Sequence, residues 1–255
     1  MELDRLNPVT LITGAASGFG AACARLLSRR SDGGLILIDG DETALGKTAD
    51  SLSHPPERVS TLAFDVADAK RWGDAAEFLQ AHYGRLDWAI VAIPGPELQP
   101  AAATDLVEWP QPVDDGLDTA FLSLRALMPL MRAHAQGGAI LVTAPAAALK
   151  PRAGRAGLLQ LIRAAAHEGA RDNIRVNAVA PGGPDTPMWP NMPWFQDLAS
   201  EAGSDEGALE GIAAMETRLA RFAADGDVAR LITLLLSDAS ALTGATLVVD
   251  GGYAI

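Results

Sequence analysis

The chain has very few cysteines and tyrosines and too little positive charge to balance its acidic residues. Its 255 residues include one cysteine and two tyrosines, and 32 acidic against 20 basic side chains give a formal net charge of −12. The single cysteine, Cys23, cannot form an internal disulfide, which fits a reducing, cytoplasmic environment. The negative charge argues against nucleic acid or an anionic membrane as a partner, because both would repel the chain.

Long apolar stretches are also missing. No window reaches about 18 apolar residues without a charge, so no membrane span is expected. Met1 to Asn7 carry Glu2 and Asp4, which argues against a signal peptide. Hydrophobic residues make up 49% of the chain, enough for a core, and charged residues only 20%, which argues against disorder. We therefore expect a cytoplasmic protein with one domain over residues 1–255.

Short β-rich apolar runs alternate with helical patterns along the sequence. This alternation predicts an α/β fold of the Rossmann type, in which a doubly wound parallel sheet is covered by helices on both faces. The predicted strands are Val9–Thr13, Leu35–Ile38, Val59–Phe64, Trp88–Ile93, Ala139–Thr143, Ile174–Val179 and Thr246–Val249.

The helical periods are clearest in three places. One helix carries Phe19, Cys23, Leu26 and Leu27 on one face, and two more are expected at about 113–134 and 154–167. The helix at about 113–134 presents Leu117, Phe121, Leu124 and Met128 on one face. Two segments break the alternation: the proline-rich Pro94–Pro112, expected to be an irregular connection, and an insertion at about 183–227, in which 207–224 is predicted to be helical.

A glycine-rich segment follows the first predicted strand and opens the first helix. It reads Thr13-Gly14-Ala15-Ala16-Ser17-Gly18-Phe19-Gly20. Glycines at such a turn let a pyrophosphate approach the backbone, while the helix start offers free N–H groups. Asp39 ends the next predicted strand, where a carboxylate accepts ribose hydroxyls and repels a 2′-phosphate. This pattern favours NAD over NADP, although an aspartate at a strand end also has a simple structural interpretation.

These motifs resemble the short-chain dehydrogenase/reductase family, and the similarity spans about residues 8 to 252. Asp65-Val66, the run Arg175 to Gly182, Thr186 with Met188, Leu242-Thr243-Gly244 and Val249 to Gly252 match further family motifs in order. The resemblance implies one domain that binds NAD, with the insertion as a lid. The positions that it assigns to the cofactor are Gly14, Ser17, Gly18, Phe19, Gly20, Asp39, Asp65, Val66, Ala92, Arg155, Pro181, Gly182 and Thr186.

The catalytic set of that family is missing. Its tyrosine position falls on Pro151, its lysine on Arg155, its serine on Pro145 and its helix asparagine on Gly116. Val91-Ala92-Ile93-Pro94 stand where the family has Asn-Asn-Ala-Gly. Realignment does not restore the set, because no serine occurs from 124 to 199 and the two tyrosines, Tyr83 and Tyr253, lie outside this region. Proline has no proton to give and a guanidinium does not deprotonate near neutral pH, so we assign no catalytic residue.

Several other residues have two interpretations. Thr143 is expected to be a strand residue rather than a catalytic hydroxyl, and Lys150 a surface residue rather than a displaced base. Tyr253 packs at the tail or reaches a neighbouring subunit. The four histidines show no metal-ligand spacing and are assigned to surface or helix positions. Trp189, Trp194 and Phe195 fit an apolar substrate pocket, the core of the insertion or a subunit contact.

Three functions remain open at this point. The first, which we favour from the sequence, is an NAD-binding family member without reductase chemistry. It would act as a structural or regulatory subunit in a homodimer, a homotetramer or a heteromer with an active paralogue. The alternative is an active NAD-dependent oxidoreductase with a non-standard site, since losing acid/base catalysis costs ~10²–10⁴-fold in rate. A lyase or isomerase is the third, with Asp114, Asp115 and Asp185 as candidates by position only.

Overall fold

The chain folds around a seven-stranded parallel sheet with the strand order β3-β2-β1-β4-β5-β6-β7. The computed structural model describes residues 7–93, 110–134, 136–143, 153–182, 193–223, 225–237 and 240–253. All seven predicted strands are present, with small differences at their ends. They are β1 (Thr10–Thr13), β2 (Leu35–Asp39), β3 (Val59–Ala63), β4 (Trp88–Val91), β5 (Gly138–Thr143), β6 (Ile174–Pro181) and β7 (Thr246–Val249).

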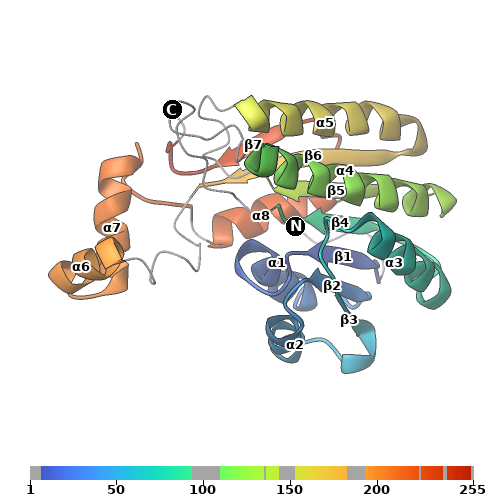
Figure 1. Cartoon of the computed structure of the whole chain (residues 1–255), viewed down its shortest axis with the longest axis horizontal. Coiled ribbons are helices and arrows are strands. Elements are labelled where there is room, and N and C mark those ends of the chain that lie inside the picture. The colour runs from blue at the N-terminus through green and yellow to red at the C-terminus, as the bar shows by residue number, and fades with distance from the viewer. Residues whose placement is uncertain are drawn as a thin grey trace.

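Helices cover both faces of this sheet, as predicted (Figure 1). The helices are α1 (Gly18–Ser28), α2 (Glu42–Asp50), α3 (Ala69–His82), α4 (Pro110–Ala133), α5 (Ala153–Gly169), α6 (Pro193–Ala202), α7 (Asp205–Glu216) and α8 (Asp225–Leu236), with short 3₁₀ turns η1 (Pro56–Arg58) and η4 (Ala170–Asp172). In β4, Ala89 and Val91 pack with α3, α4 and α5, whereas Trp88 and Ile90 pack with α1 and α8. Because successive side chains point to opposite faces, a strand covered on both sides is apolar throughout.

Helix α4 differs from its prediction in two respects. It begins at Pro110, inside the segment expected to be irregular, and proline suits the first turn of a helix because its fixed φ is already helical and its missing N–H is not needed there. Leu124 and Met128 are buried as predicted, but Phe121 is 49% exposed. The buried face is centred on Ala120, Leu124 and Leu127, so Phe121 lies at its margin.

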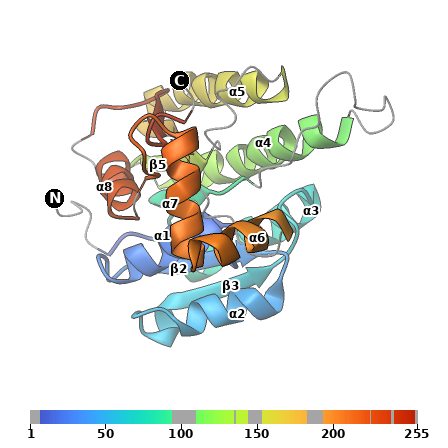
Figure 2. The same cartoon turned by 90° about the vertical axis from the view of Figure 1, so that its left-hand side faces the viewer.

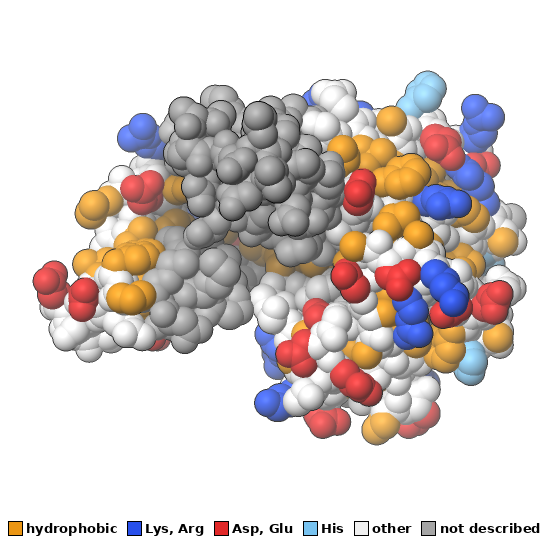
Figure 3. All heavy atoms as spheres, in the orientation of Figure 1, with side chains coloured by type: hydrophobic (Ala, Val, Ile, Leu, Met, Phe, Trp, Pro, Cys, Tyr) orange, Lys and Arg blue, Asp and Glu red, His pale blue; other side chains and the backbone are white. Residues whose placement is uncertain are grey.

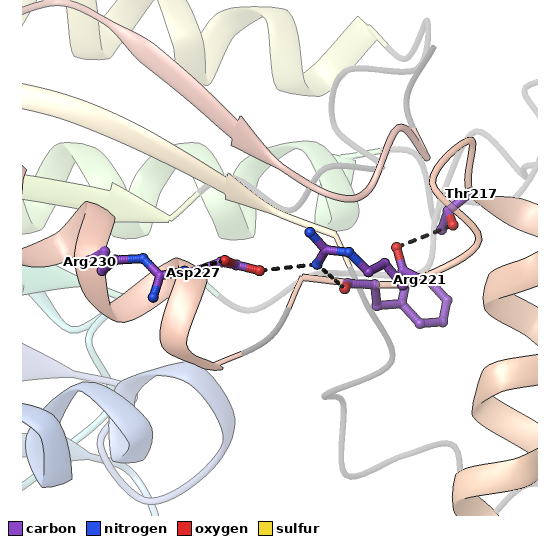
Figure 4. A network of polar contacts seen from close by, with 5 residues as sticks. Thr217, Arg221, Asp227 and Arg230 are labelled. Atoms are coloured by element: carbon purple, nitrogen blue, oxygen red, sulfur yellow. Dashed lines mark hydrogen bonds and ion pairs between the residues drawn. The ribbon is translucent and has the colours of Figure 1, made fainter.

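The predicted helix over 207–224 is wrong at its carboxyl end, because α7 ends at Glu216. Thr217 leaves the helix with extended backbone, and its hydroxyl donates to the carbonyls of Ala213 and Arg221. The Arg221 guanidinium then bonds to Asp227, which also binds Arg230 on α8 (Figure 4). This network joins the end of α7 to the body of the fold.

The α6–α7 segment (Pro193–Glu216) stands apart from the helical layers. It lies on the left in Figure 1, and in Figure 2, viewed from that side, it lies in front of the sheet. Phe195 is its largest buried side chain, with Trp194 packed edge-to-face on it at 5.9 Å between ring centroids. Trp194 remains 49% exposed, and Met215 is 83% exposed. Phe195 is therefore core of this segment, whereas Trp194 presents an apolar surface.

Candidate functional site

The strand order places a topological switch point between β1 and β4. From β1 the chain runs outward to β2 and β3, then returns to the other side of β1 and continues through β5, β6 and β7. In open parallel sheets ligands bind in the crevice beyond the carboxyl ends of the strands at such a point. Thr13, Asp39, Val91, Thr143 and Pro181 end their strands at this edge.

The glycine-rich loop leaves β1 at the switch point, and its glycines are required by close contacts. Gly14 has φ +62°, and a Cβ on it would lie 3.0 Å from the Cβ of Ala92. A Cβ on Gly20 would lie 2.2 Å from the carbonyl oxygen of Gly14, a distance that real atoms do not adopt. The loop therefore folds back tightly between β1 and the start of α1, where only glycine fits at these two positions.

The start of α1 differs from that of its neighbours. Ser17 precedes the helix and is exposed, but its side chain caps no N–H group, and the first turn has no acidic residue within this described part of the chain. By contrast, Asp41 accepts from Ala44 N at the start of α2, and Asp68 caps α3. The first N–H groups of α1 are thus available to an anion. Phe19 is half-buried and packs in the core under the loop.

Asp39 connects the end of β2 to the glycine-rich loop. One carboxylate oxygen accepts a hydrogen bond from Ala16 N at 3.0 Å, and the other accepts from Asp41 N at 3.1 Å. The side chain is only half-buried, and each carboxylate oxygen can accept a further bond. Asp39 is therefore held in place and still able to accept ribose hydroxyls.

The next strand end adds more negative charge. Asp65 is exposed, and one of its oxygens accepts from Ala67 N at 2.9 Å, while the half-buried Val66 offers its carbonyl to Trp72 Nε1 at 2.9 Å. Phe64 N donates to Asp39 O at 2.9 Å, which keeps the two strand ends together. Asp39 and Asp65 thus lie on one acidic part of the edge.

Beyond β4, two threonine hydroxyls hold the backbone. Thr13 Oγ1 accepts from Ala92 N at 3.1 Å, and Thr143 Oγ1 accepts from Ile93 N at 2.8 Å. Ile93 also faces α4, where a Cβ on Gly116 would lie 3.4 Å from its Cγ2. Gly116 is the position of the family's helix asparagine, so an apolar contact with Ile93 replaces a polar side chain there.

The exit of β6 is held by the following strand. Pro181 is half-buried, and the buried Gly182 donates its N–H to Val249 O at 2.9 Å. Two residues of the same motif have structural partners that the sequence did not reveal. The Arg175 guanidinium donates to the carbonyls of Leu235, Leu236 and Ser237 at the end of α8. Asn177 bonds to Leu242 O and Ala245 N, and thereby fixes the turn before β7.

Several predicted site residues lie outside the described residues, namely Pro145, Lys150, Pro151, Asp185, Thr186 and Trp189. Arg155 lies in the first turn of α5, and Asp114 and Asp115 lie in α4, but their side chains are also outside the description. The structure therefore brings together the glycine-rich loop, Asp39, Asp65, Ala92 and the Pro181–Gly182 exit.

The remaining candidates take other places. Tyr83 lies near the start of β3, away from this edge, with its hydroxyl 2.8 Å from Ser60 Oγ, whereas the half-buried Tyr253 follows β7. His54 corrects the assignment to a surface or helix position: it is buried between α1 and β2, with ring nitrogens facing the carbonyls of Ser28 and Gly33, because the turn after α1 folds over it. Complete burial raises the pKa of the Cys23 thiol, which disfavours the reactive thiolate.

The described side chains include no group of three or more histidine, cysteine, aspartate or glutamate residues that could hold a metal ion. None of the helices, over the residues described, is long and apolar enough to cross a membrane.

Comparisons with known proteins agree with this geometry. A family model described as enoyl-(acyl carrier protein) reductase matches residues 14–254. Cis-4-hydroxycyclohexanecarboxylate dehydrogenase of Sinomonas cyclohexanicum is 31% identical over 254 residues, covering 96% of each chain. Cyclopentanol dehydrogenase of Comamonas testosteroni is 31% identical over 261 residues, covering 98% of this chain and 99% of the relative.

Solved structures give the same result. Carveol dehydrogenase from Mycobacterium avium, in complex with NAD, superposes with a TM-score of 0.83 at 25% identity, covering 98% of this chain and 99% of that one. L-sorbose reductase from Gluconobacter frateurii, complexed with NADPH and L-sorbose, gives 0.86 at 27% identity, covering 99% and 98%. The family model, the full-length relatives and the shared fold lead to one conclusion: the chain belongs to the short-chain dehydrogenase/reductase family of oxidoreductases.

Proposed function

We propose that the protein is an NAD(H)-dependent oxidoreductase that interconverts small secondary alcohols and ketones through a non-standard catalytic site. The observation that carries the proposal is the Asp39 carboxylate, bonded to the glycine-rich loop and still open to a ligand. The sequence alone favoured a subunit without chemistry. The comparisons favour the oxidoreductase instead, because relatives matched along almost their whole length are dehydrogenases.

The dinucleotide fits the residues present at the edge. The backbone of the glycine-rich loop and the uncapped start of α1 would hold the pyrophosphate, and Asp39 the adenosine ribose. Asp65 and Val66 would border the adenine, with Ala92 and the Pro181–Gly182 exit toward the nicotinamide. From the family resemblance we add Arg155 and Thr186 to this set. When bound, NAD supplies the hydride acceptor.

The acidic part of the edge supports NAD rather than NADP. Asp39 ends β2 and Asp41 follows it, and Asp65 and Asp68 follow the adjacent β3. A 2′-phosphate near these carboxylates would meet repulsion, whereas the ribose hydroxyls of NAD donate to them. The structural neighbours include complexes with either nucleotide, so this preference is a specific property that we propose for this chain.

The substrate class follows from the relatives and from the charge of the insertion. Several relatives are named for alicyclic alcohols, among them cyclopentanol and cyclohexanol. We propose that the insertion at about 183–227 covers the substrate. Its α6–α7 segment has six acidic side chains and no basic one, and it exposes Trp194 and Met215. Figure 3 shows hydrophobic and acidic side chains next to each other on this segment. Such a surface favours uncharged, apolar alcohols over carboxylates.

A second candidate is the subunit without chemistry that the sequence predicted. The specific observation in its favour is the missing serine, tyrosine and lysine, which removes the usual proton donor of the family. In this case the protein binds NAD and contributes to a homo-oligomer or to a heteromer with an active paralogue. The lyase or isomerase hypothesis gains no support, because Asp114, Asp115 and Asp185 have no described side chains.

One assay separates the two candidates. Purified protein is incubated with NAD and cyclopentanol or cyclohexanol, and the absorbance of NADH is followed. Slow, saturable turnover with NAD and much less with NADP supports the oxidoreductase. Tight NADH binding without turnover on any alicyclic alcohol or ketone supports the subunit, and the absence of NADH binding contradicts both.

A further inference from the structure

The two described residues that follow β4, Ala92 and Ile93, have no polar side chain. Val91, Ala92 and Ile93 are all apolar, yet the backbone there reaches the edge where the dinucleotide is proposed to bind. Buried N–H groups need acceptors, and past the end of a strand the sheet no longer supplies them all. The N–H groups of Ala92 and Ile93 therefore need acceptors from neighbouring side chains.

Two threonines supply them, one from each flanking strand. Thr13 ends β1 and accepts from Ala92 N at 3.1 Å, and Thr143 ends β5 and accepts from Ile93 N at 2.8 Å. β4 pairs with both strands, so the segment lies between them. Thr13 is 0% and Thr143 4% exposed, so water does not compete for these bonds. We call this pair of hydroxyls the threonine clamp.

The clamp extends to the glycine-rich loop and to α4. Ala92 already approaches Gly14 so closely that an added Cβ would lie 3.0 Å from the Cβ of Ala92. Ile93, 7% exposed, packs toward Gly116 on α4. A displacement of Ile93 would therefore move Ala92 and, through it, the loop that is proposed to hold the pyrophosphate.

We infer that Thr143 is a positioning residue, which fixes the post-β4 backbone through Ile93 and so sets the affinity for the dinucleotide. The inference rests on the proposed binding of NAD(H). It gives this hydroxyl, the single one between Leu124 and Asp185, a role that is not acid/base chemistry. The bond from Ile93 N already directs the hydroxyl oxygen to the backbone.

The test compares isosteric and conservative variants at one position. Thr143→Val keeps the shape but removes the acceptor, whereas Thr143→Ser keeps the hydroxyl. Thr10→Val is the matched control, because Thr10 is a buried threonine (1% exposed) that begins β1, at the opposite edge of the sheet from Thr143. For each variant, NADH affinity is measured by fluorescence titration, and amide hydrogen exchange is followed at Ile93.

Loss of one buried acceptor predicts about tenfold weaker NADH binding in Thr143→Val, with Thr143→Ser within about twofold of wild type. Exchange at Ile93 accelerates in Thr143→Val and not in Thr10→Val, which keeps wild-type affinity for NADH. In the turnover assay, the KM for NAD rises in Thr143→Val while kcat at saturating NAD changes by less than about twofold.

Three results would overturn the inference. NADH affinity of Thr143→Val equal to wild type, with a lowered free energy of unfolding, would make the bond a purely structural one. A fall in kcat with unchanged NADH affinity would place the hydroxyl on the substrate. If wild type itself bound no NADH, the proposed function would fail instead, and unaltered exchange at Ile93 would separately show that the clamp does not hold the segment.

Discussion

The two halves of the sheet edge use their polar groups differently. At the β1–β3 end, Asp39 and Asp65 bond to local backbone and keep oxygens open to a ligand. At the β4–β6 end, described N–H groups donate to groups of the protein itself, as Ile93 N does to the Thr143 hydroxyl and Gly182 N to the carbonyl of Val249. The groups that are open to a ligand and the groups that bond to one another therefore lie at different ends of the edge, and the proposed adenosine site belongs to the first kind.

The largest expected effect is on NADH binding and comes from a substitution in the glycine-rich loop. In Gly20→Ala the new Cβ meets the Gly14 carbonyl oxygen at 2.2 Å, so the loop must move. We expect loss of detectable NADH binding and a free energy of unfolding lowered by roughly 3 kcal/mol. Fluorescence titration and urea unfolding measure the two effects.

A second glycine serves as the control. Gly46 lies in α2 with nothing within 4 Å of an added Cβ, so Gly46→Ala should stabilise the protein by about 0.5–1 kcal/mol. NADH binding that survives Gly20→Ala would contradict the close approach of loop and helix.

Asp39→Ala sharpens the comparison further. Removal of the carboxylate takes away the acceptor for two ribose hydroxyls and the bond to Ala16 N. We expect roughly 30-fold weaker NADH binding and loss of the preference over NADPH, measured by calorimetry. Asp68→Ala removes only the cap of α3, costs about 1 kcal/mol of stability and should leave NADH affinity unchanged. Equal effects of the two substitutions would remove Asp39 from the site.

A smaller effect is expected where the α6–α7 segment joins the body. Ala220 has φ +51°, a left-handed conformation that favours glycine. Ala220→Gly should therefore raise the free energy of unfolding by about 0.5–1 kcal/mol without altering NADH affinity. Ala214→Gly, on the exposed face of α7, should lower it by about 1 kcal/mol. Thermal unfolding of both variants checks the opposite signs.

The smallest effect is expected at the chemical end. Pro151→Tyr restores one member of the family's catalytic set, but the serine and the lysine are still missing. Turnover of cyclohexanol with NAD should change by less than about twofold, because a phenol without its partners adds little general acid/base catalysis. A large gain in kcat would show that the remaining site needs only a proton donor.

Much of this arrangement was predictable from local sequence. The central strands are buried on both faces and are continuous apolar runs, and the edge strands β3 and β7 are also rich in β-forming residues, so all seven were found. The glycine-rich loop and Asp39 follow from spacing alone. Features that depend on residues distant in the sequence were not predictable in this way. The end of α7 at Glu216 depends on Thr217 and on Gly251, whose added Cβ would meet Arg221 O at 2.0 Å. No local pattern reveals such a contact.

The same limit applies to the site. The threonine clamp requires the register between β4 and β5, in which Val91 lies opposite Val142, and sequence periodicity does not give this register. Arg175 and Asn177 were recognised as a motif, but their hydrogen bonds to the end of α8 and to the turn before β7 became visible only in the structure. Phe121 was predicted on the apolar face of α4 but is exposed, because the helix also buries the small residues Ala120 and Ser123, which shifts the buried face away from it.

A calorimetric titration of the wild-type protein with NADH and NADPH tests the central claim most directly. The proposed nucleotide end predicts saturable NADH binding in the micromolar range, at least about tenfold tighter than NADPH, and roughly 30-fold weaker NADH binding in Asp39→Ala. No binding of NADH at millimolar concentration, or a preference for NADPH, would contradict the account.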